Sequence, residues 1–254
     1  MTPDPFRLDD KAAIVTGAGR GLGRAMAVAL GNAGADVVLV ARRREDLTEA
    51  CEAVAATGRR GFAVAGDVTD PEIAKHAVEV AERELGRLDI LVNNAGLYHM
   101  QPIEETSVED FRRVLEVNLI GSYLFAAAVG PVFKQQKSGK VVNVGSILGR
   151  VGVAGASAYC AAKAGVAGFT RSLAVEWAPF GVGVNAISPG LFNTDMSKVV
   201  FDTPEMYEGI MAGIPRGVHG EPGDLDGTIV YLCSSASDHM IGQVLHVDGG
   251  SSIA

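Results

Sequence analysis

Tyr159 and Lys163 are the residues whose types and spacing best suit chemistry in this chain. A helical pattern begins near Ser157, and residues four apart lie on one face of a helix, about one turn from each other. A free tyrosine has a pKa of about 10, and a nearby ammonium favours the phenolate. We therefore expect Lys163 to lower the pKa of Tyr159 and to make it a proton donor and acceptor near neutral pH.

Ser146 is a third candidate because it follows the short apolar run 141–144, which is typical of a buried strand. A hydroxyl at the carboxyl end of that strand is placed to hold a substrate oxygen opposite the tyrosine. The Tyr-x-x-x-Lys spacing alone also fits a surface tyrosine beside a solvated lysine. Motifs elsewhere in the chain distinguish these two interpretations.

A glycine-rich loop near the N-terminus predicts a phosphate site. Residues 12–16 form an apolar run of strand length, Gly17, Gly21 and Gly23 follow it, and a helical pattern covers 22–33. Glycines let a ligand approach the backbone, and the helix N-terminus presents N–H groups and the positive end of the helix dipole. The spacing G-x-x-x-G-x-G differs from the dinucleotide-binding fingerprint G-x-G-x-x-G. No Lys-Ser/Thr pair follows the glycines, so the loop is not a nucleoside-triphosphate P-loop either. A purely structural glycine turn is the alternative.

Arg42 bears on which dinucleotide such a loop would bind. The second strand pattern ends at Ala41, where an acidic residue would accept from a ribose 2′-hydroxyl and an arginine would pair with a 2′-phosphate. We therefore expect NADP(H) to be favoured over NAD(H), with Arg42 on the phosphate and Arg20 as a second positive contact. Arg43 and Arg44 are interpreted as solvated residues at a helix start.

Strands and helices alternate along the whole chain, without a linker or an internal repeat. Further strands are expected at 62–65, 88–92, 182–188 and 243–247, and further helices at 45–57, 71–85, 108–136, from 157, and 222–235. This alternation predicts one α/β domain over 1–254, with a Rossmann-type doubly wound parallel sheet of about seven strands and helices on both faces. Ligands bind beyond the carboxyl ends of such strands. Residues 191–220 have little strand pattern and are interpreted as a mobile apolar flap on the substrate side.

Composition and charge exclude several classes of protein. Of the 254 residues 48% are hydrophobic, which is enough for a large core, and the net charge of −8 argues against a nucleic-acid partner. The three cysteines are far apart and no Cys/His cluster exists, so we expect free thiols and no metal site. No apolar run reaches the length of a membrane span, and the N-terminus lacks the apolar region of a secretory signal. We expect a cytoplasmic protein.

The motifs together closely resemble those of the short-chain dehydrogenase/reductase family. They stand in family order from Lys11 to Gly250 and comprise Thr16-Gly17-x-x-x-Gly21-x-Gly23, Asp67, Asn93-Asn94-Ala95-Gly96, Asn118, Ser146, Tyr159-x-x-x-Lys163, Pro189-Gly190 and Asp248-Gly249-Gly250. The resemblance implies an enzyme that interconverts a carbonyl and a secondary alcohol by hydride transfer with NAD(P), most often as a homotetramer. It also implies a catalytic tetrad of Asn118, Ser146, Tyr159 and Lys163.

Roles for single residues follow from the same resemblance. Tyr159 would protonate the carbonyl oxygen, Ser146 would orient it, Lys163 would hold the nicotinamide ribose, and Asn118 would position a water. The cofactor-binding residues would be Gly17, Arg20, Gly21, Leu22, Gly23, Arg42, Asp67, Val68, Asn94, Ala95, Gly96, Tyr159, Lys163, Pro189, Gly190 and Thr194. From its own chemistry, Asp67 is equally suited to cap a turn, and Asn118 should kink its helix because its amide competes with the backbone.

The candidate substrate pocket is mostly apolar, which favours an uncharged or partly apolar carbonyl. Its residues are Tyr98, His99, Ile147, Leu148 and Phe192. His99 is the only titratable residue among them, and a loop histidine is equally consistent with an ordinary surface residue.

The substrate class stays open at this stage. The chain looks most like the 3-oxoacyl-acyl-carrier-protein reductases, which tend to carry a basic residue where Phe180 stands here. Lys134, Lys137 and Lys140 form either a basic patch for a carrier protein or a solvated helix end. Gluconate-type dehydrogenases and broad carbonyl reductases remain possible, and the alternative of another class is a non-catalytic dinucleotide-binding sensor or scaffold.

Overall fold

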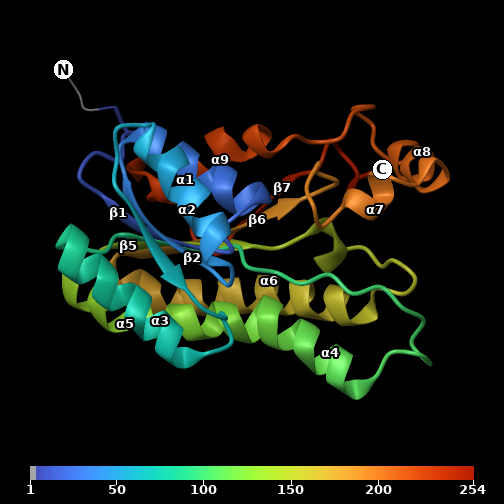
Figure 1. Cartoon of the computed structure of the whole chain (residues 1–254), viewed down its shortest axis with the longest axis horizontal. Coiled ribbons are helices and arrows are strands. Elements are labelled where there is room, and N and C mark those ends of the chain that lie inside the picture. The colour runs from blue at the N-terminus through green and yellow to red at the C-terminus, as the bar shows by residue number, and fades with distance from the viewer. Residues whose placement is uncertain (1–3) are drawn as a thin grey trace.

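Seven parallel strands form one sheet at the centre of the computed structural model, which describes residues 4–254, in the order β3-β2-β1-β4-β5-β6-β7 (Figure 1). Every neighbouring pair is parallel. The strands are β1 (Ala12–Thr16), β2 (Asp36–Ala41), β3 (Gly61–Ala65), β4 (Ile90–Asn93), β5 (Gly139–Val144), β6 (Val182–Pro189) and β7 (Val244–Val247). The predicted seven-stranded Rossmann-type sheet is confirmed.

Helices connect the strands and cover the sheet. They are α1 (Gly21–Ala33), α2 (Arg44–Ala55), α3 (Pro71–Val80), α4 (Val108–Leu115), α5 (Gly121–Gln136), α6 (Ser157–Trp177), α7 (Lys198–Phe201), α8 (Pro204–Met211) and α9 (Asp226–Cys233). The helix predicted over 108–136 is continuous but contains a π-helical turn, Glu116–Ile120, and the helix predicted from 222 begins with a 3₁₀ turn, Pro222–Leu225.

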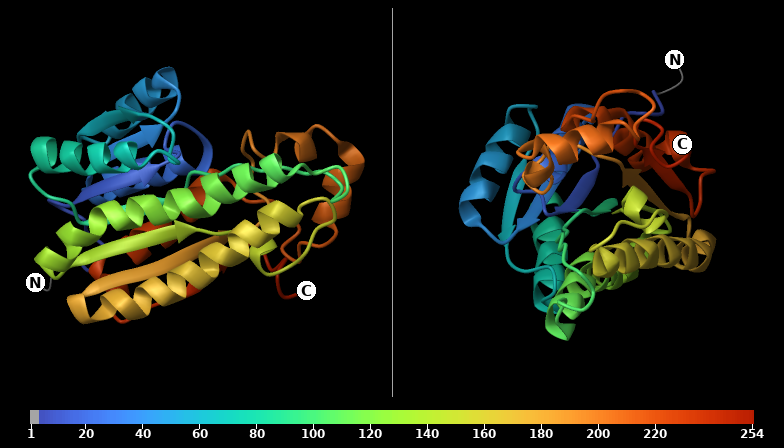
Figure 2. Two further views of the ribbon diagram at one scale, coloured as in Figure 1. Left: turned by 90° about the horizontal axis from the view of Figure 1, so that it is seen from below. Right: turned by 90° about the vertical axis from the view of Figure 1, so that its right-hand side faces the viewer.

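The core lies in two layers, one on each face of the sheet. Side chains of α1, α2 and α9 form one layer, with Met26, Leu47 and Ile229 fully buried. Those of α3, α5 and α6 form the other, where α5 and α6 run alongside each other (Figure 2). Central strands covered on both faces are mostly apolar, which is why β1 has the sequence AAIVT and is buried along its whole length.

The segment Val108–Gln136 is long and apolar enough to cross a membrane by length and composition alone. The expectation that no apolar run reaches the length of a membrane span did not take this segment into account. In the fold, Phe125 and Phe133 on this segment are fully buried in the layer formed with α3 and α6. A core helix has the same composition as a span, so its place against the sheet accounts for the hydropathy of the segment.

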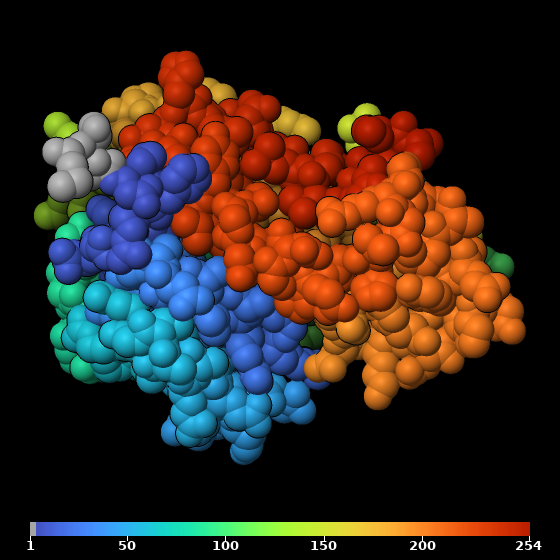
Figure 3. Space-filling view, turned by 90° about the horizontal axis from the view of Figure 1, so that it is seen from above, coloured from blue at the N-terminus to red at the C-terminus, as the bar shows by residue number. Residues whose placement is uncertain are grey.

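Residues 191–220 contain more regular structure than predicted. The two short helices α7 and α8 lie in this flap, and its chain returns through a bridge between Phe192 and Gly220. In the space-filling view this orange segment forms a lobe beside the N-terminal half of the molecule (Figure 3).

Replacing Phe125 with alanine is expected to lower the free energy of unfolding by about 3–5 kcal/mol, since it leaves a cavity between α5 and the sheet. Urea unfolding followed by circular dichroism measures the change. Ile103→Ala, at a side chain that is 64% exposed, is the control and should change stability by less than about 0.5 kcal/mol. Equal losses in both variants would contradict the layer assignment.

Candidate active site

The structure brings Ser146, Tyr159 and Lys163 together at the carboxyl end of β5. Ser146 stands just past Val144, the last residue of the strand, and its hydroxyl accepts a hydrogen bond from the backbone N–H of Leu148 at 3.1 Å. One turn apart on α6, Lys163 lies behind Tyr159, with Nζ 5.5 Å from the centre of the tyrosine ring. The Lys163 Nζ donates to the carbonyl oxygen of Val144 at 2.8 Å, which ties the helix to the strand.

Burial controls the ionisation of both side chains. Tyr159 is 8% exposed and Lys163 is 4% exposed. Burial raises the pKa of Tyr159 to about 12, although a hydrogen bond to the Ser146 side chain acts in the opposite direction. Burial also lowers the pKa of Lys163 to about 8. The prediction that Lys163 lowers the pKa of Tyr159 is therefore wrong for this structure, because desolvation is the largest cause of the shift and Tyr98 and Cys160 act in the same direction.

Asn118 lies in the π-helical turn between α4 and α5, close to the loop that follows β4. Its side-chain Nδ2 donates to the carbonyl oxygens of Leu97 at 2.7 Å and Val114 at 2.9 Å. The backbone carbonyl of Asn118 accepts from the Ser122 hydroxyl at 3.2 Å. A side-chain amide that bonds to backbone carbonyl groups competes with the regular hydrogen bonds of the helix. This competition explains why the helix has a π-helical turn here.

A small apolar cluster surrounds Tyr159 and holds part of the predicted substrate pocket. The Tyr98 ring meets the Tyr159 ring edge to face, with centres 5.0 Å apart, and Leu148 packs against the same cluster. Ile147 is half-buried in the 3₁₀ turn after Ser146. His99 is also half-buried, and its Nε2 lies 3.2 Å from Oε1 of Gln101, so the imidazole is engaged within its own loop.

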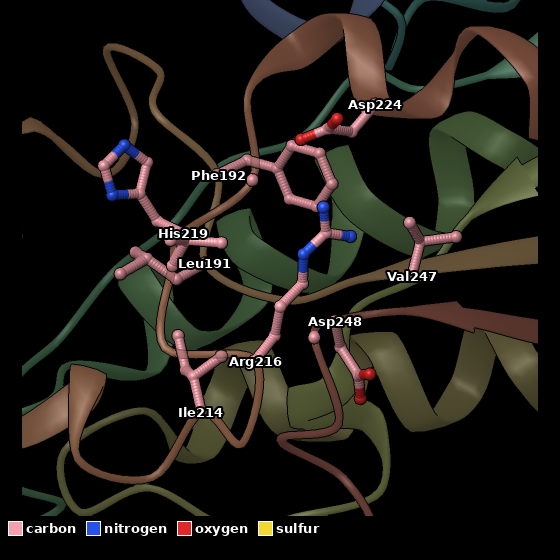
Figure 4. Close-up of a pocket in the computed structure, with 11 residues that line it drawn as sticks. Leu191, Phe192, Ile214, Arg216, His219, Asp224, Val247 and Asp248 are labelled. Carbon is pink, nitrogen blue, oxygen red and sulfur yellow. The ribbon is translucent and has the colours of Figure 1, made fainter.

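Phe192 lies elsewhere than the rest of the predicted substrate residues. It is 5% exposed and belongs to the core layer of α1 and α9, not to the cluster around Tyr159. Its ring borders a cavity of about 130 Å³ that is also lined by Arg216 and by Asp248 beyond the end of β7 (Figure 4). The predicted contact of Phe192 with substrate thus gains no support from its position.

The glycine loop has the close backbone contacts that a phosphate cradle needs. Gly17 has a φ of 62°, and a Cβ there would lie 2.8 Å from Cα of Ala95. A Cβ at Gly23 would lie 2.1 Å from the carbonyl oxygen of Gly17. Asn94 fixes the loop, because its Nδ2 donates to the carbonyl oxygens of Thr16 at 3.0 Å and Gly17 at 3.2 Å. No side chain other than hydrogen is possible at the two glycines without moving the loop.

The N-terminus of α1 is free to bind an anion. No side chain caps it and its first turn has no acidic residue, so its N–H groups and dipole are uncompensated within the described chain. A cleft of about 510 Å³ opens there, lined by Gly21 and by Thr194 from the flap. Leu22, the next residue of α1, packs into the core layer below. These residues fit the pyrophosphate of a dinucleotide, which they would hold by backbone N–H groups.

The two arginines predicted at a 2′-phosphate differ in their surroundings. Arg42 is exposed and makes no hydrogen bond or ion pair within residues 4–254. Arg20 forms an ion pair with Asp195 of the flap, with Nη1 and Oδ2 2.9 Å apart. Arg43 pairs with Asp46 at 2.7 Å and is therefore not merely solvated.

The remaining predicted cofactor residues lie along the same edge of the sheet. Burial opposes the ionisation of Asp67, but hydrogen bonds from Arg113 and Thr69 outweigh it and hold its pKa at about 2. The Asp67 carboxylate thus caps a turn, as its alternative interpretation proposed, and Val68 beside it is buried. Gly190, after Pro189, is packed so closely that a Cβ would lie 2.8 Å from Cα of Asp248.

Two polar interactions at this edge were not assigned from the sequence. Nδ2 of Asn93 donates to Oδ1 of Asn143, and Nδ2 of Asn143 donates to the Thr170 hydroxyl, both at 2.9 Å, so β4, β5 and α6 are joined inside the core. A polar residue within the apolar run of β5 is the signal that could have revealed this. Met196 of the flap lies near the NNAG loop, and a Cβ added at Gly96 would lie 3.7 Å from its terminal methyl group.

Comparisons with known proteins agree with this geometry. The family model described as enoyl-(acyl carrier protein) reductase matches residues 17–252. The 2-dehydro-3-deoxy-D-gluconate 5-dehydrogenase of Bacillus subtilis is 39% identical over 97% of this chain and 96% of its own length. The 3-oxoacyl-[acyl-carrier-protein] reductase of Vibrio cholerae is 36% identical over 96% of this chain and 98% of its own. A crystal structure of a putative NAD(P)-dependent gluconate 5-dehydrogenase from Beutenbergia cavernae, with bound NADP, is 39% identical, with a TM-score of 0.94 over 99% of this chain and all of its own.

Fold and site together define a dinucleotide-dependent α/β oxidoreductase. The chain belongs to the short-chain dehydrogenase/reductase family, whose members act on CH–OH groups with NAD(P). The family resemblance seen in the sequence is thereby confirmed over nearly the whole chain.

The buried Lys163 predicts a pH-dependent stability. The pKa of its side chain is about 8 in the folded chain, against 10.5 ordinarily. Between pH 8 and pH 10.5 the unfolded chain therefore holds more protons than the folded chain, and the free energy of unfolding rises with pH across this range. Lys163→Met removes this cost and should raise the free energy of unfolding at pH 7 by about 1–3 kcal/mol. The gain should disappear as the pH approaches 10.5.

Chemical denaturation between pH 7 and pH 10.5 measures this effect. Lys75→Met is the control, because Lys75 is exposed and pairs only with Glu72 of its own helix. A Lys163→Met variant that is less stable than wild type at pH 7 would show that the buried amine stabilises the fold.

Proposed function

We propose that this enzyme is an NADP(H)-preferring reductase of free, partly apolar ketones, with Asn118, Ser146, Tyr159 and Lys163 as its catalytic tetrad. The observation that carries the proposal is the buried tyrosine beside a serine hydroxyl in an apolar cluster. A phenol with a pKa of about 12 keeps its proton at neutral pH. It is therefore in the form that the general acid of ketone reduction requires.

Each residue of the tetrad has one task in this mechanism. Ser146 donates a hydrogen bond to the carbonyl oxygen and orients it, and Tyr159 gives its proton to the same oxygen. Lys163, anchored to the carbonyl oxygen of Val144, binds the nicotinamide ribose and stands behind Tyr159 as a proton source. Asn118 holds the loop at Leu97 in place from the other side. The bound cofactor supplies the hydride, and the protein supplies geometry and proton delivery.

An acyl carrier protein is not part of the proposal, because two of the three lysines that could dock it are engaged and only Lys137 makes no ion pair within residues 4–254. Lys134 pairs with Glu176 at 3.1 Å, and its Nζ lies 5.2 Å from the centre of the Phe180 ring. Lys140 pairs with Asp238 at 2.8 Å and its side chain is only 14% exposed. The basic patch considered from the sequence is therefore largely neutralised, and a free small molecule is the better substrate.

The second candidate is oxidation or reduction of a gluconate-type sugar acid, favoured by the names of relatives such as the Bacillus subtilis enzyme. The apolar side chains packed around Tyr159 favour the ketone instead.

We also propose a single catalytic domain over 1–254 that assembles as a homotetramer in the cytoplasm. Support for assembly comes from three exposed apolar residues: Tyr123 on α5, Ile120 just before it, and Val175 on α6. The four residues of β7 are also only partly buried. Free thiols suit a reducing compartment.

A panel of carbonyls tests the substrate class by the oxidation of NADPH and NADH at about 340 nm. It contains an aryl ketone, a diketone, 5-ketogluconate and a 3-oxoacyl thioester without carrier protein. Turnover of the aryl ketone or diketone supports the main proposal, and turnover of 5-ketogluconate alone supports the second candidate. No turnover of any compound would favour the non-catalytic alternative.

Tyr159→Phe is expected to lower kcat by about 10²–10⁴-fold, because the proton donor is lost while the ring remains. Binding of NADPH, followed by fluorescence titration, should change by less than about twofold. Tyr231→Phe, which lies on α9 on the other face of the sheet, is the matched control and should keep full activity. Unchanged turnover in Tyr159→Phe would show that this hydroxyl is not the acid.

Arg42→Ala is expected to weaken NADPH binding by about 10-fold or more, the range of a charge-assisted hydrogen bond, and to leave NADH binding unchanged. Titration of each cofactor gives the two dissociation constants. Arg44→Ala, which also removes an exposed arginine near the end of β2, should alter neither. Equal weakening of NADPH and NADH would remove Arg42 from the 2′-phosphate site.

A further inference from the structure

The ion pair between Arg20 and Asp195 joins the glycine loop to the flap across 175 positions of sequence. Nη1 of Arg20 lies 2.9 Å from Oδ2 of Asp195, and the two side chains are 56% and 59% exposed. Asp195 lines the cleft above the N-terminus of α1, and Arg20 is the residue that directly precedes this helix. Arg20 is also the second positive contact expected for a 2′-phosphate of the cofactor, beside Arg42.

The flap turn that carries Asp195 is held firmly in place. The Ser197 hydroxyl accepts from the backbone N–H of Thr194 at 3.1 Å and donates back to its carbonyl oxygen at 3.0 Å. The side chain of Thr194 faces Gly21, and a Cβ added at that glycine would lie 3.6 Å from it. Asp195 is therefore carried by a turn that is closed by its own hydrogen bonds.

We propose that Asp195 is a specificity-determining residue that weakens the preference of this enzyme for NADP(H). Its carboxylate engages the guanidinium of Arg20, so a 2′-phosphate has to displace it, whereas Arg42 makes no bond within residues 4–254 and has no such competitor. The carboxylate also repels the phosphate, since charges within about 8 Å are only partly screened at physiological salt. The inference rests on the NADP(H) site proposed above.

The expected effect is small, because both partners are exposed to solvent. Exposed ion pairs contribute little, so releasing Arg20 should tighten the binding of a 2′-phosphate by roughly two- to fivefold. Ligands without that phosphate should be unaffected. This selectivity separates the proposed competition from a general change in the stability of the flap.

Calorimetric titration with 2′,5′-ADP and 5′-AMP tests the inference, because the two probes differ only in the 2′-phosphate. Asp195→Asn should tighten 2′,5′-ADP by roughly two- to fivefold and leave 5′-AMP unchanged. The gain should vanish when Arg20→Ala is added. The matched control is Asp202→Asn, which removes a carboxylate from the lining of the same cleft and should tighten neither probe.

Two results would overturn this inference and leave the proposed NADP(H) preference unaffected. If wild type prefers 2′,5′-ADP but Asp195→Asn does not tighten it, the carboxylate does not compete. If Asp202→Asn gives an equal gain, only the overall charge of the cleft matters. If wild type binds both probes equally and Arg42→Ala changes nothing, then the NADP(H) preference itself is wrong and the inference is lost with it.

Discussion

The parallel direction of all seven strands is the constraint on which the site depends. Each strand must be followed by a helix that returns the chain along a face of the sheet, so all the strands end at the same edge. The glycine loop after β1, the NNAG loop after β4 and Ser146 after β5 come from distant parts of the sequence. They meet because no other arrangement of a parallel sheet is available to them.

Polar side chains form a network within the core beneath this edge, although one buried acceptor, Oδ1 of Asn93, has no hydrogen-bond partner within residues 4–254. Asn93, Asn143 and Thr170 bond to one another where β4, β5 and α6 meet, and all three are at most 3% exposed. Buried polar groups without partners are costly, so this network favours one register of β4 against β5 over its alternatives. The same region carries Lys163 and Tyr159 on α6, and their positions are therefore fixed by interactions below the site.

Much of this architecture could be predicted from the sequence because its signals are local. Apolar runs gave strand positions within a few residues, and the β2 range 36–41 agrees at both ends. Local patterns could not reveal the ion pair of Arg20 with Asp195 or the placement of Phe192 on the other face, since both depend on how a distant flap folds back. The pKa of Tyr159 was misjudged for a related reason: spacing shows which charge is near, whereas burial depends on every neighbouring element.

Burial raises the pKa of Tyr159 and lowers the pKa of Lys163, so it favours the neutral form of both side chains. A protonated phenol is the form that can give a proton to a carbonyl, and an amine with a pKa of about 8 can gain or lose a proton near neutral pH. The anchor from Lys163 to Val144 keeps this amine in place whichever form it takes, since a neutral amine still donates. The apolar surroundings that make the pair costly to the fold thus make it suited to delivering protons.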